Sequence, residues 1–189
     1  DIKNTKSIGM YLKIEESDDL TNEGTINVSG SRSTGMRADR EGTGGAGQPK
    51  IINNNIINVT GEISFGMVAL GNSTTTSAIA DNTGKISLGG KQTVGMYAEN
   101  GGEINNTATG NNKGILGTRE NSIGMFIKDN TSKGTNTGII NVSGSYVKGV
   151  YNSGDFTMTD GSVTVSGANA TGFDVRVAGN KTKVQKGTI

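Results

Sequence analysis

Hydrophobic and polar residues alternate in short segments that recur along the whole chain. In these segments isoleucine or valine is interleaved with asparagine, serine or threonine, and glycine stands at the ends. The alternation has the period of two that is typical of a half-buried β-strand. A helix would need apolar residues three and four positions apart, and it tolerates so much glycine, asparagine and threonine poorly. The pattern therefore predicts a protein built from short strands.

One segment, centred on glycine followed by an apolar residue, occurs seven times. It predicts a strand whose methionine, with the residues two before and two after it, faces the interior, while the glycine and the residue after the methionine face outward. In the last two copies Val150 and Phe173 replace the methionine. The seven copies are Ser7–Leu12, Ser33–Ala38, Ser64–Ala69, Thr93–Ala98, Ser122–Ile127, Val147–Asn152 and Ala170–Val175.

A second segment with a central isoleucine or valine precedes each later copy. The six examples are Gly24–Gly30, Asn55–Gly61, Gly84–Gly90, the degraded Lys113–Gly117, Gly138–Gly144 and Gly161–Gly167. We call the first kind of segment the Gly-Met segment. The central residue of the second kind stands nine positions before the glycine of the next Gly-Met segment in all six cases, whereas the interval from that glycine to the next central residue varies from 14 to 22 residues. One part of each unit is therefore rigid, and the other is expected to be a loop that tolerates insertion.

A repeat of about 27 residues predicts one turn of a solenoid that contains two or three short strands. A single turn cannot bury its apolar face, but stacked turns can. We therefore predict an all-β, right-handed parallel β-helix of about seven coils, in which residues 1–189 form a single segment of a longer protein. The right-handed type is favoured because short six-residue periods are absent and the loops are long and irregular. Corners that need a positive φ are expected at Gly30, Gly61, Gly90, Gly144 and Gly167.

Composition narrows the functional classes. The chain has 31 glycines, 31% hydrophobic residues and a net charge of +1, so neither nucleic acid nor an anionic membrane is an expected partner. It contains no cysteine and no histidine, which removes thiol nucleophiles, disulfides, imidazole bases and the usual zinc sites. No apolar run approaches the roughly 20 residues of a membrane-spanning helix. We predict no cofactor and no metal site.

The residues that follow the methionines are the first candidate binding site. Tyr97, Phe126 and Tyr151 fall on consecutive turns and predict an outward aromatic ladder beside a flat strip of glycines. Such rings stack on sugars or engage a protein partner. The alternative is that they shield the sheet and one another.

The second candidate is the longest insertion, 37–50, which contains Arg37, Arg40 and the single proline. Long loops on rigid scaffolds usually carry recognition, but the alternative, a mobile surface loop that has no partner, is favoured for this segment. Segments 71–82 and 99–113 are further candidate loops.

The sequence gives weaker evidence for a metal site or a catalytic site. The methionine column contains soft ligands for Cu(I), but packing in the core explains it better because methionine fills irregular interior space. No two carboxylates recur at matching offsets in adjacent repeats, so the convergent titratable groups of a catalytic site are not predicted.

The units Gly24–Gly30 followed by Ser33–Ala38, and Thr93–Ala98, resemble the passenger repeats of large Gram-negative autotransporters, closest to the fusobacterial outer-membrane adhesins. The resemblance covers essentially the whole chain. It implies a type V secretion passenger on the cell surface, anchored in the outer membrane through a C-terminal β-barrel that is absent here, with a host-cell or bacterial surface protein or glycan as its partner.

The sequence thus predicts a non-enzymatic adhesin stalk, a virulence-type cell-adhesion segment that projects or carries a binding surface. One alternative is a structural spacer or self-association module. Another is a β-helix enzyme that degrades polysaccharides, which the scarcity of carboxylates in the strands disfavours.

Overall fold

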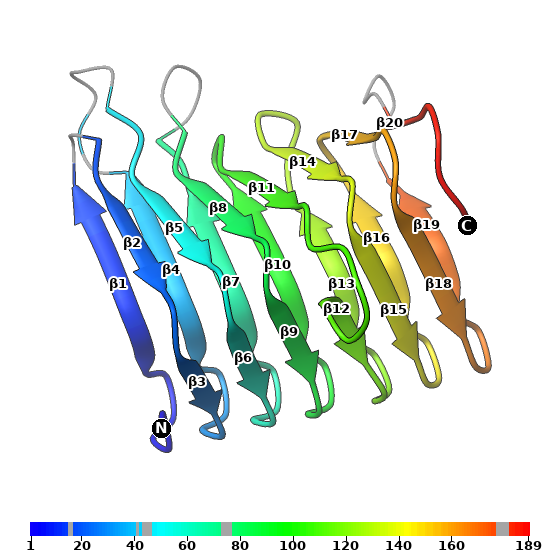
Figure 1. Ribbon diagram of the computed structural model, residues 1–189, viewed down its shortest axis with the longest axis horizontal. Helices are drawn as coiled ribbons and strands as arrows, with labels where there is room; N and C mark the ends of the chain where they lie inside the picture. The colour runs from blue at the N-terminus through cyan, green and yellow to red at the C-terminus, as the bar shows by residue number, and fades with distance from the viewer. Residues whose placement is uncertain (15–16, 41, 43–46, 73–76, 177–181) are drawn as a thin grey trace.

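The computed structural model describes residues 1–14, 17–40, 42, 47–72, 77–176 and 182–189. In these parts of the chain there are twenty strands and no helix. The strands pair in parallel within three sheets and stack side by side from the N-terminus to the C-terminus (Figure 1). The predicted all-β parallel solenoid is confirmed.

Each sheet is named here after a residue type that characterises it. The Met sheet contains β1 (Ile8–Ile14), β4 (Thr34–Arg40), β7 (Phe65–Leu70), β10 (Val94–Glu99), β13 (Ile123–Ile127), β16 (Lys148–Asn152) and β19 (Thr171–Val175). The Asn sheet contains β2 (Asp19–Asn22), β5 (Lys50–Asn53), β8 (Ile79–Asn82), β11 (Glu103–Asn106), β14 (Lys133–Asn136), β17 (Asp155–Met158) and β20 (Thr182–Val184). The Ile sheet contains β3 (Thr25–Val28), β6 (Ile56–Val59), β9 (Lys85–Leu88), β12 (Gly114–Gly117), β15 (Ile139–Ser143) and β18 (Ser162–Ser166).

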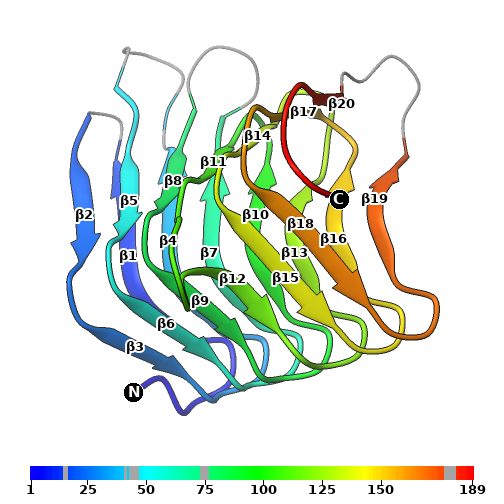
Figure 2. The same ribbon diagram turned by 45° about the vertical axis from the view of Figure 1, so that its right-hand side comes forward.

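The chain visits the Met, Asn and Ile sheets in that order in every turn (Figure 2). It completes six turns from β1 to β18 and then adds β19 and β20. The seven predicted Gly-Met segments are the seven strands of the Met sheet, and the six isoleucine segments are the six strands of the Ile sheet. The strands of the Asn sheet, three or four residues long, lie in the part that we predicted to be a loop of free length.

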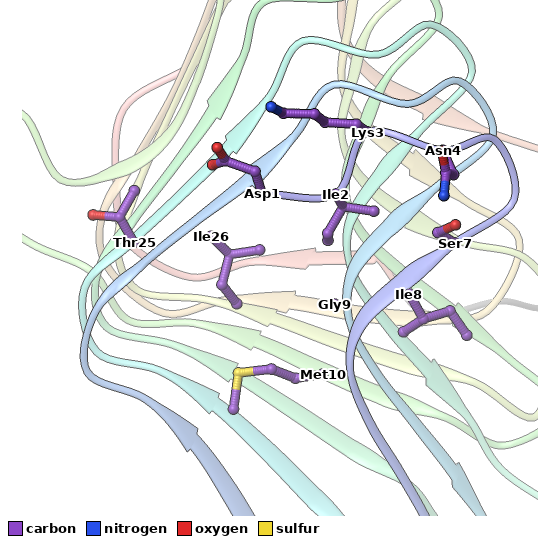
Figure 3. Close-up of a pocket in the computed structure, with 10 residues that line it drawn as sticks. All are labelled: Asp1, Ile2, Lys3, Asn4, Ser7, Ile8, Gly9, Met10, Thr25 and Ile26. Carbon is purple, nitrogen blue, oxygen red and sulfur yellow. The ribbon is translucent and has the colours of Figure 1, made fainter.

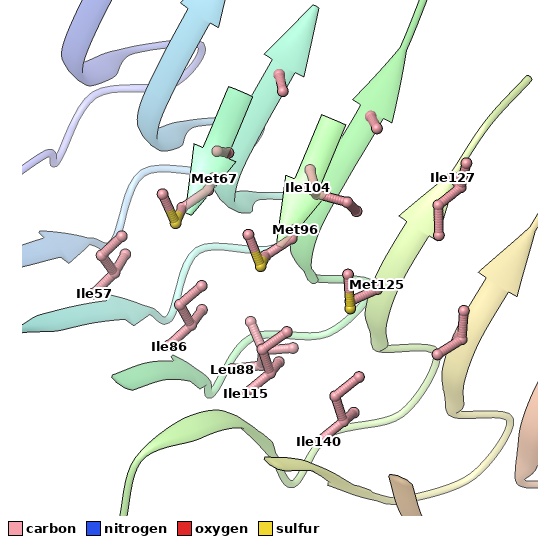
Figure 4. Packing of buried hydrophobic residues seen from close by; sticks show 14 of the residues in the cluster. Ile57, Met67, Ile86, Leu88, Met96, Ile104, Ile115, Met125, Ile127 and Ile140 are labelled. Carbon is pink, nitrogen blue, oxygen red and sulfur yellow. The ribbon is translucent and has the colours of Figure 1, made fainter. Parts of the chain in front are cut away.

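The hydrophobic core consists of columns of similar residues from successive turns. The strand register places Met36 beside Met67, and Met67 beside Met96. These three side chains, with Met125 and Val150, have no exposed surface. Figure 4 shows methionines of the Met sheet facing isoleucines of the Ile sheet across the interior. The predicted core role of the methionine column is confirmed.

The glycine of each Gly-Met segment lies inside the solenoid and not on its outer face. A Cβ atom added to Gly95 would lie 2.6 Å from Cγ2 of Ile115 and 2.6 Å from the carbonyl oxygen of Gly124. At Gly66 the added atom would lie 2.7 Å from Cγ2 of Ile86. The isoleucine column of the Ile sheet therefore packs directly on the glycine column. Our prediction of an outward glycine strip is wrong, because the strand alternation breaks at the glycine.

This break moves the residue before the glycine to the outer face. Phe65, which we expected to point inward, contacts the Tyr97 ring at a centroid distance of 5.4 Å. The register pairs Phe65 with Val94 and Met67 with Met96, whereas the glycines between them are left out of the pairing. Neither strand carries an extra residue, so the arrangement is a local break in the alternation, in which glycine and methionine both face the interior.

The corner between the Ile and Met sheets needs a left-handed residue in every turn. The residue three positions before each Gly-Met glycine has φ between 55° and 58°, and it is Lys6, Arg32, Ile63, Gln92, Asn121, Tyr146 or Asn169.

Two of the five corner glycines have the positive φ that we predicted. They are Gly144 (128°) and Gly167 (118°). Gly30, Gly61 and Gly90 do not, so the prediction is wrong for them. They are needed because the backbone of the previous turn is too near for a side chain: an added Cβ would lie 2.0, 2.1 and 2.6 Å from a carbonyl oxygen of that turn.

A ladder of buried asparagines runs through the corner between the Asn and Ile sheets, which the sequence analysis did not predict. Its members are Asn22, Asn53, Asn82, Asn106 and Asn136, all at most 5% exposed. Each Nδ2 donates to the Oδ1 of the next asparagine at 2.8 to 2.9 Å. The amides also bind the backbone, as where Nδ2 of Asn106 donates to the carbonyl oxygen of Ile139 at 3.1 Å. The ladder satisfies polar groups that have no access to water.

The predicted loops have different boundaries in the structure. Segment 37–50 begins with the last four residues of β4 and ends with the first residue of β5, and its residues 41 and 43–46 lie outside the described part. Segments 71–82 and 99–113 contain β8 and β11, and residues 73–76 are likewise not described.

A cavity of about 400 Å³ lies beside the first turn of the described chain (Figure 3). Ile2, Met10 and Ile26 line it and are partly buried against the core. The core side chains of later turns lie between two turns, which is why they are more deeply buried. The complete lining is Asp1, Ile2, Lys3, Asn4, Ser7, Ile8, Gly9, Met10, Thr25 and Ile26.

The contact between the glycine and isoleucine columns predicts that Gly95→Ala is destabilising. The added methyl group would meet a backbone oxygen that cannot move without breaking the stack, so we expect the free energy of unfolding to fall by about 1–3 kcal/mol. Urea unfolding followed by circular dichroism measures this. The control is Gly24→Ala, where the nearest atom is 4.0 Å from the added Cβ. Equal unfolding midpoints for the two variants would contradict the proposed packing.

The asparagine ladder predicts a similar difference between buried and exposed asparagines. Asn82→Ala removes one hydrogen bond to Asn53 and one to Asn106, both buried, so we expect a loss of about 2 kcal/mol in the free energy of unfolding. Asn58→Ala, which removes a half-buried bond to Asn27 on the outer face of the Ile sheet, should cost about 0.5 kcal/mol or less. A larger loss for Asn58→Ala in the same urea titration would show that the ladder is not a main stabilising element.

Candidate binding surface on the Met sheet

The outer face of the Met sheet carries two columns of side chains across its strands. One column holds the residues that precede the glycines, and the other holds the residues that follow the methionines. The first is Ile8, Thr34, Phe65, Val94, Ile123, Lys148 and Thr171, and the second is Tyr11, Arg37, Val68, Tyr97, Phe126, Tyr151 and Asp174. Both columns come from adjacent strands, so their spacing is fixed by the backbone register.

Four rings on this face form a continuous aromatic ladder, made of Phe65, Tyr97, Phe126 and Tyr151. Tyr97 packs edge-to-face on Phe126 at a centroid distance of 5.3 Å, and Phe126 packs on Tyr151 at 4.6 Å. Phe65 contacts Tyr97 from the neighbouring column at 5.4 Å. The predicted ladder of three rings on consecutive turns is confirmed, and Phe65 extends it. All four rings are half-buried, which leaves part of each one available to a partner.

The middle of the ladder is linked to an ion pair. The Tyr97 hydroxyl donates to Oε2 of Glu99 at 2.7 Å, and the Lys128 ammonium binds the other carboxylate oxygen. Burial and then the bond to Glu99 raise the pKa of Tyr97 to about 12. Burial alone would raise the pKa of Glu99, but the hydrogen bonds from Lys128 and Tyr97 outweigh it and hold that pKa below its ordinary value. Glu99 therefore remains a charged acceptor at neutral pH.

The C-terminal end of the ladder is flanked by a second ionic cluster. Asp174 pairs with Lys148 and with Arg176, each at 2.6 Å. The two cations also lie over the Tyr151 ring, at 4.8 Å for the Lys148 ammonium and 5.7 Å for the Arg176 guanidinium carbon. These contacts are cation–π interactions. They hold the ring of Tyr151 in place from the side opposite Phe126.

The N-terminal end has a third cluster around Arg37. Its guanidinium binds Asp39 through two bonds of 2.7 and 2.8 Å, and the Tyr11 hydroxyl donates to the same carboxylate at 2.7 Å. Paired in this way, Arg37 presents a fixed planar edge beside the ladder.

A shallow hollow separates Arg37 from the rings. It has a volume of about 230 Å³ and lies where the small side chain of Val68 interrupts the outward column. Val68 is 5% exposed and forms the floor. The full lining is Thr34, Arg37, Phe65, Val68, Leu70, Tyr97 and Glu99. The hollow thus combines apolar ring surface with one basic and one acidic group on its rim.

The five residues that we selected from sequence are distributed as follows. Arg37 and Tyr97 meet at the hollow, and Phe126 and Tyr151 continue the ladder from it. Arg40 does not join this surface: it ends β4 and is 5% exposed, so it does not lie in an exposed loop as we expected.

Sequence reasoning missed three members of this surface. Phe65 was placed in the interior because regular alternation was assumed across the glycine. Glu99 was included only as the first residue of the candidate loop 99–113, and Lys128 was not considered. A residue two positions beyond an outward one shares its face, so Tyr97 followed by Glu99 was a usable signal.

Metal ligands, membrane-spanning helices and similar proteins assign no further function to the described part of the chain. Among the described residues, no group of three or more histidine, cysteine, aspartate or glutamate side chains could hold a metal ion. No helix in the described part of the chain is long and apolar enough to cross a membrane. No protein-family model, curated protein or solved structure matches the sequence or the fold of this chain.

The lowered pKa values predict how this surface responds to acid. Glu99 and Asp174 have folded-state pKa values below their ordinary values, so their contribution to stability is present above the unfolded pKa and is lost as pH falls through the folded pKa. We expect the melting temperature to fall between about pH 5 and pH 3. The melting temperature of the double variant Glu99→Gln/Asp174→Asn should fall less over this pH interval than that of the unmodified chain. Melting temperatures that fall equally with pH in the two proteins would show that these two carboxylates are not the source of the acid sensitivity.

Proposed function

We propose that this chain is a non-enzymatic segment of a cell-surface adhesin, of the type V autotransporter class that its repeats resemble. The solenoid serves as a stalk, and the outer face of the Met sheet presents a binding surface to a surface protein or glycan of a host cell or another bacterium. In this proposal the chain is exported and exposed outside the outer membrane. The stalk-like β-solenoid is compatible with this role.

The observation that carries the proposal is the aromatic ladder. Its four rings and the adjoining hollow lie on an outer face that no part of the described chain covers. Ring positions are set by backbone register and by flanking ion pairs, so little conformational freedom would be lost on binding. Aromatic side chains and arginine are the residue types enriched at protein recognition surfaces.

The state of the carboxylates supports a non-enzymatic role. A general acid needs a pKa raised toward neutral pH. Glu99 and Asp174, the carboxylates beside the rings, instead have lowered pKa values because lysine and arginine partners stabilise their charged forms. These groups are suited to holding side chains in place and not to transferring protons.

A structural spacer is the second candidate function, and one observation favours it. The rings pack on one another, and the charges beside them are paired within the chain. A surface satisfied in this way is a stable wall even without a ligand. Binding experiments distinguish the two functions.

The proposal predicts that Tyr97→Ala/Phe126→Ala/Tyr151→Ala abolishes adhesion. The rings supply most of the apolar contact area, so we expect binding on glycan and protein arrays, and to whole cells, to fall by about tenfold or more. Circular dichroism should confirm that the solenoid persists in the variant.

The matched control is Tyr146→Asn, which removes a ring that is 58% exposed at the corner between the Ile and Met sheets and does not belong to the aromatic ladder. Asparagine occupies the equivalent left-handed position in two other turns, at Asn121 and Asn169. Undiminished adhesion by the triple variant would favour the spacer function instead.

A further inference from the structure

We propose that a groove on the Ile-sheet side of the solenoid binds the anionic group of an acidic saccharide, such as a carboxylated or sulfated sugar. The groove has a volume of about 250 Å³ and is separate from the aromatic ladder. It is called the insertion groove here, and its lining is Asn54, Asn55, Ile56, Gly84, Lys85, Asn111, Asn112 and Lys113. The inference extends the proposed function by giving one surface of the stalk a defined ligand class.

One wall of the groove exists because of an insertion. In four of the turns, the buried asparagine of the ladder stands four residues before the central isoleucine of the next strand, as Asn82 does before Ile86. Between Asn106 and Ile115 the distance is nine residues. The five additional residues form a turn beside β12, between the end of β11 and the Ile sheet (Figure 1).

This inserted turn is anchored at both ends. The amide of Thr107 donates to the carbonyl oxygen of Asn82 at 2.9 Å, and the amide of Gly114 donates to that of Gly84 at 2.9 Å. Ala108 is 1% exposed and its carbonyl oxygen accepts the amide of Ile139 at 3.1 Å. The groove is therefore built into the scaffold and does not need to form on binding.

The groove is rich in hydrogen-bond donors and positive charge. Lys85 uses one N–H to bind Oδ1 of Asn112 at 2.9 Å, which holds its ammonium at the groove and leaves two donors. The backbone amide of the exposed Lys113 donates to the carbonyl oxygen of Gly110 at 3.3 Å, but its ammonium group makes no hydrogen bond or ion pair among the described residues. No carboxylate belongs to the lining itself, although the Glu23 carboxylate lies beside it and accepts a hydrogen bond from Nδ2 of the lining residue Asn54 at 2.6 Å. This differs from the Met sheet, where Arg37, Lys128 and Lys148 are each bound to a carboxylate.

The chemistry of these side chains selects the ligand. Two ammonium groups without a carboxylate partner favour a carboxylate or sulfate group. The amide of Asn111 and Nδ2 of Asn112 also make no hydrogen bond within the described chain, and amides pair well with sugar hydroxyls. Ile56 is half-buried and adds an apolar surface for the carbon–hydrogen face of a sugar ring. A free inorganic anion would use only the two ammonium groups.

The test is isothermal titration calorimetry of the full chain with four probes: glucuronic acid, a sulfated heparin disaccharide, inorganic sulfate and glucose. We expect the two acidic saccharides to bind more tightly than sulfate or glucose, and their affinity to fall as salt is raised. Lys85→Gln/Lys113→Gln should weaken saccharide binding roughly tenfold or more, because two charge-assisted hydrogen bonds are lost.

The charge-matched control is Lys133→Gln/Lys183→Gln, which removes two exposed lysines from the Asn sheet. An equal loss in this control would overturn the proposal in favour of nonspecific charge attraction. Sulfate binding as tight as the saccharides, or glucose as tight as glucuronic acid, would also overturn it. The triple aromatic variant should bind the saccharides normally, so failure at the groove and failure at the Met sheet can be told apart.

Discussion

The structure depends on the close approach of the isoleucine and glycine columns at the corner between the Ile and Met sheets. An added Cβ at the glycines of β4, β7, β10 and β13 would lie 2.6 to 2.8 Å from an isoleucine methyl group of the Ile-sheet strand in the same turn. The two sheets can converge at this corner only if the side chain is absent. The constant nine-residue offset belongs to the other connection, which runs from the central isoleucine of one turn to the glycine of the next turn and keeps the two columns in register. The close contact at the glycine also accounts for the break in alternation that turns Phe65 outward.

Much of this fold follows from the sequence, because it is set by a repeated local pattern. Seven Gly-Met segments and six isoleucine segments predicted the Met and Ile sheets, and the register of Met36 with Met67 follows from aligning the repeats. The Asn sheet was missed because its strands are three or four residues long and lie at variable distances from the motifs. Its signal was present nonetheless: Asn22, Asn53, Asn82 and Asn136 each precede a central isoleucine by four residues. Outside a strand, an asparagine is ordinarily a turn residue, so the buried ladder was not inferred.

The binding surface was less predictable than the fold, because it depends on which face each residue takes. The column of Tyr97, Phe126 and Tyr151 was correctly placed, since those residues follow buried methionines by one position. Phe65 was not, because the strand alternation breaks at Gly66, where the glycine and Met67 both face the interior. Arg40 illustrates a second difficulty. The strand β4 is seven residues long and β7 is six, so where the strand ends and the loop begins is not visible in the motif.

The distribution of charge distinguishes the two outer surfaces in physical terms. On the Met sheet, carboxylates and cations are held within hydrogen-bond distance of one another, so this face offers shape and apolar area with little net charge. On the Ile-sheet side, Lys85 is bound to an amide and no carboxylate lines the groove. Both surfaces sit on strands whose positions are fixed by the same stacking, so a ligand at either one meets a rigid array. A repetitive backbone therefore leaves specificity to the few positions where the repeat is broken: Val68 opens the hollow, and the insertion after Asn106 builds the groove.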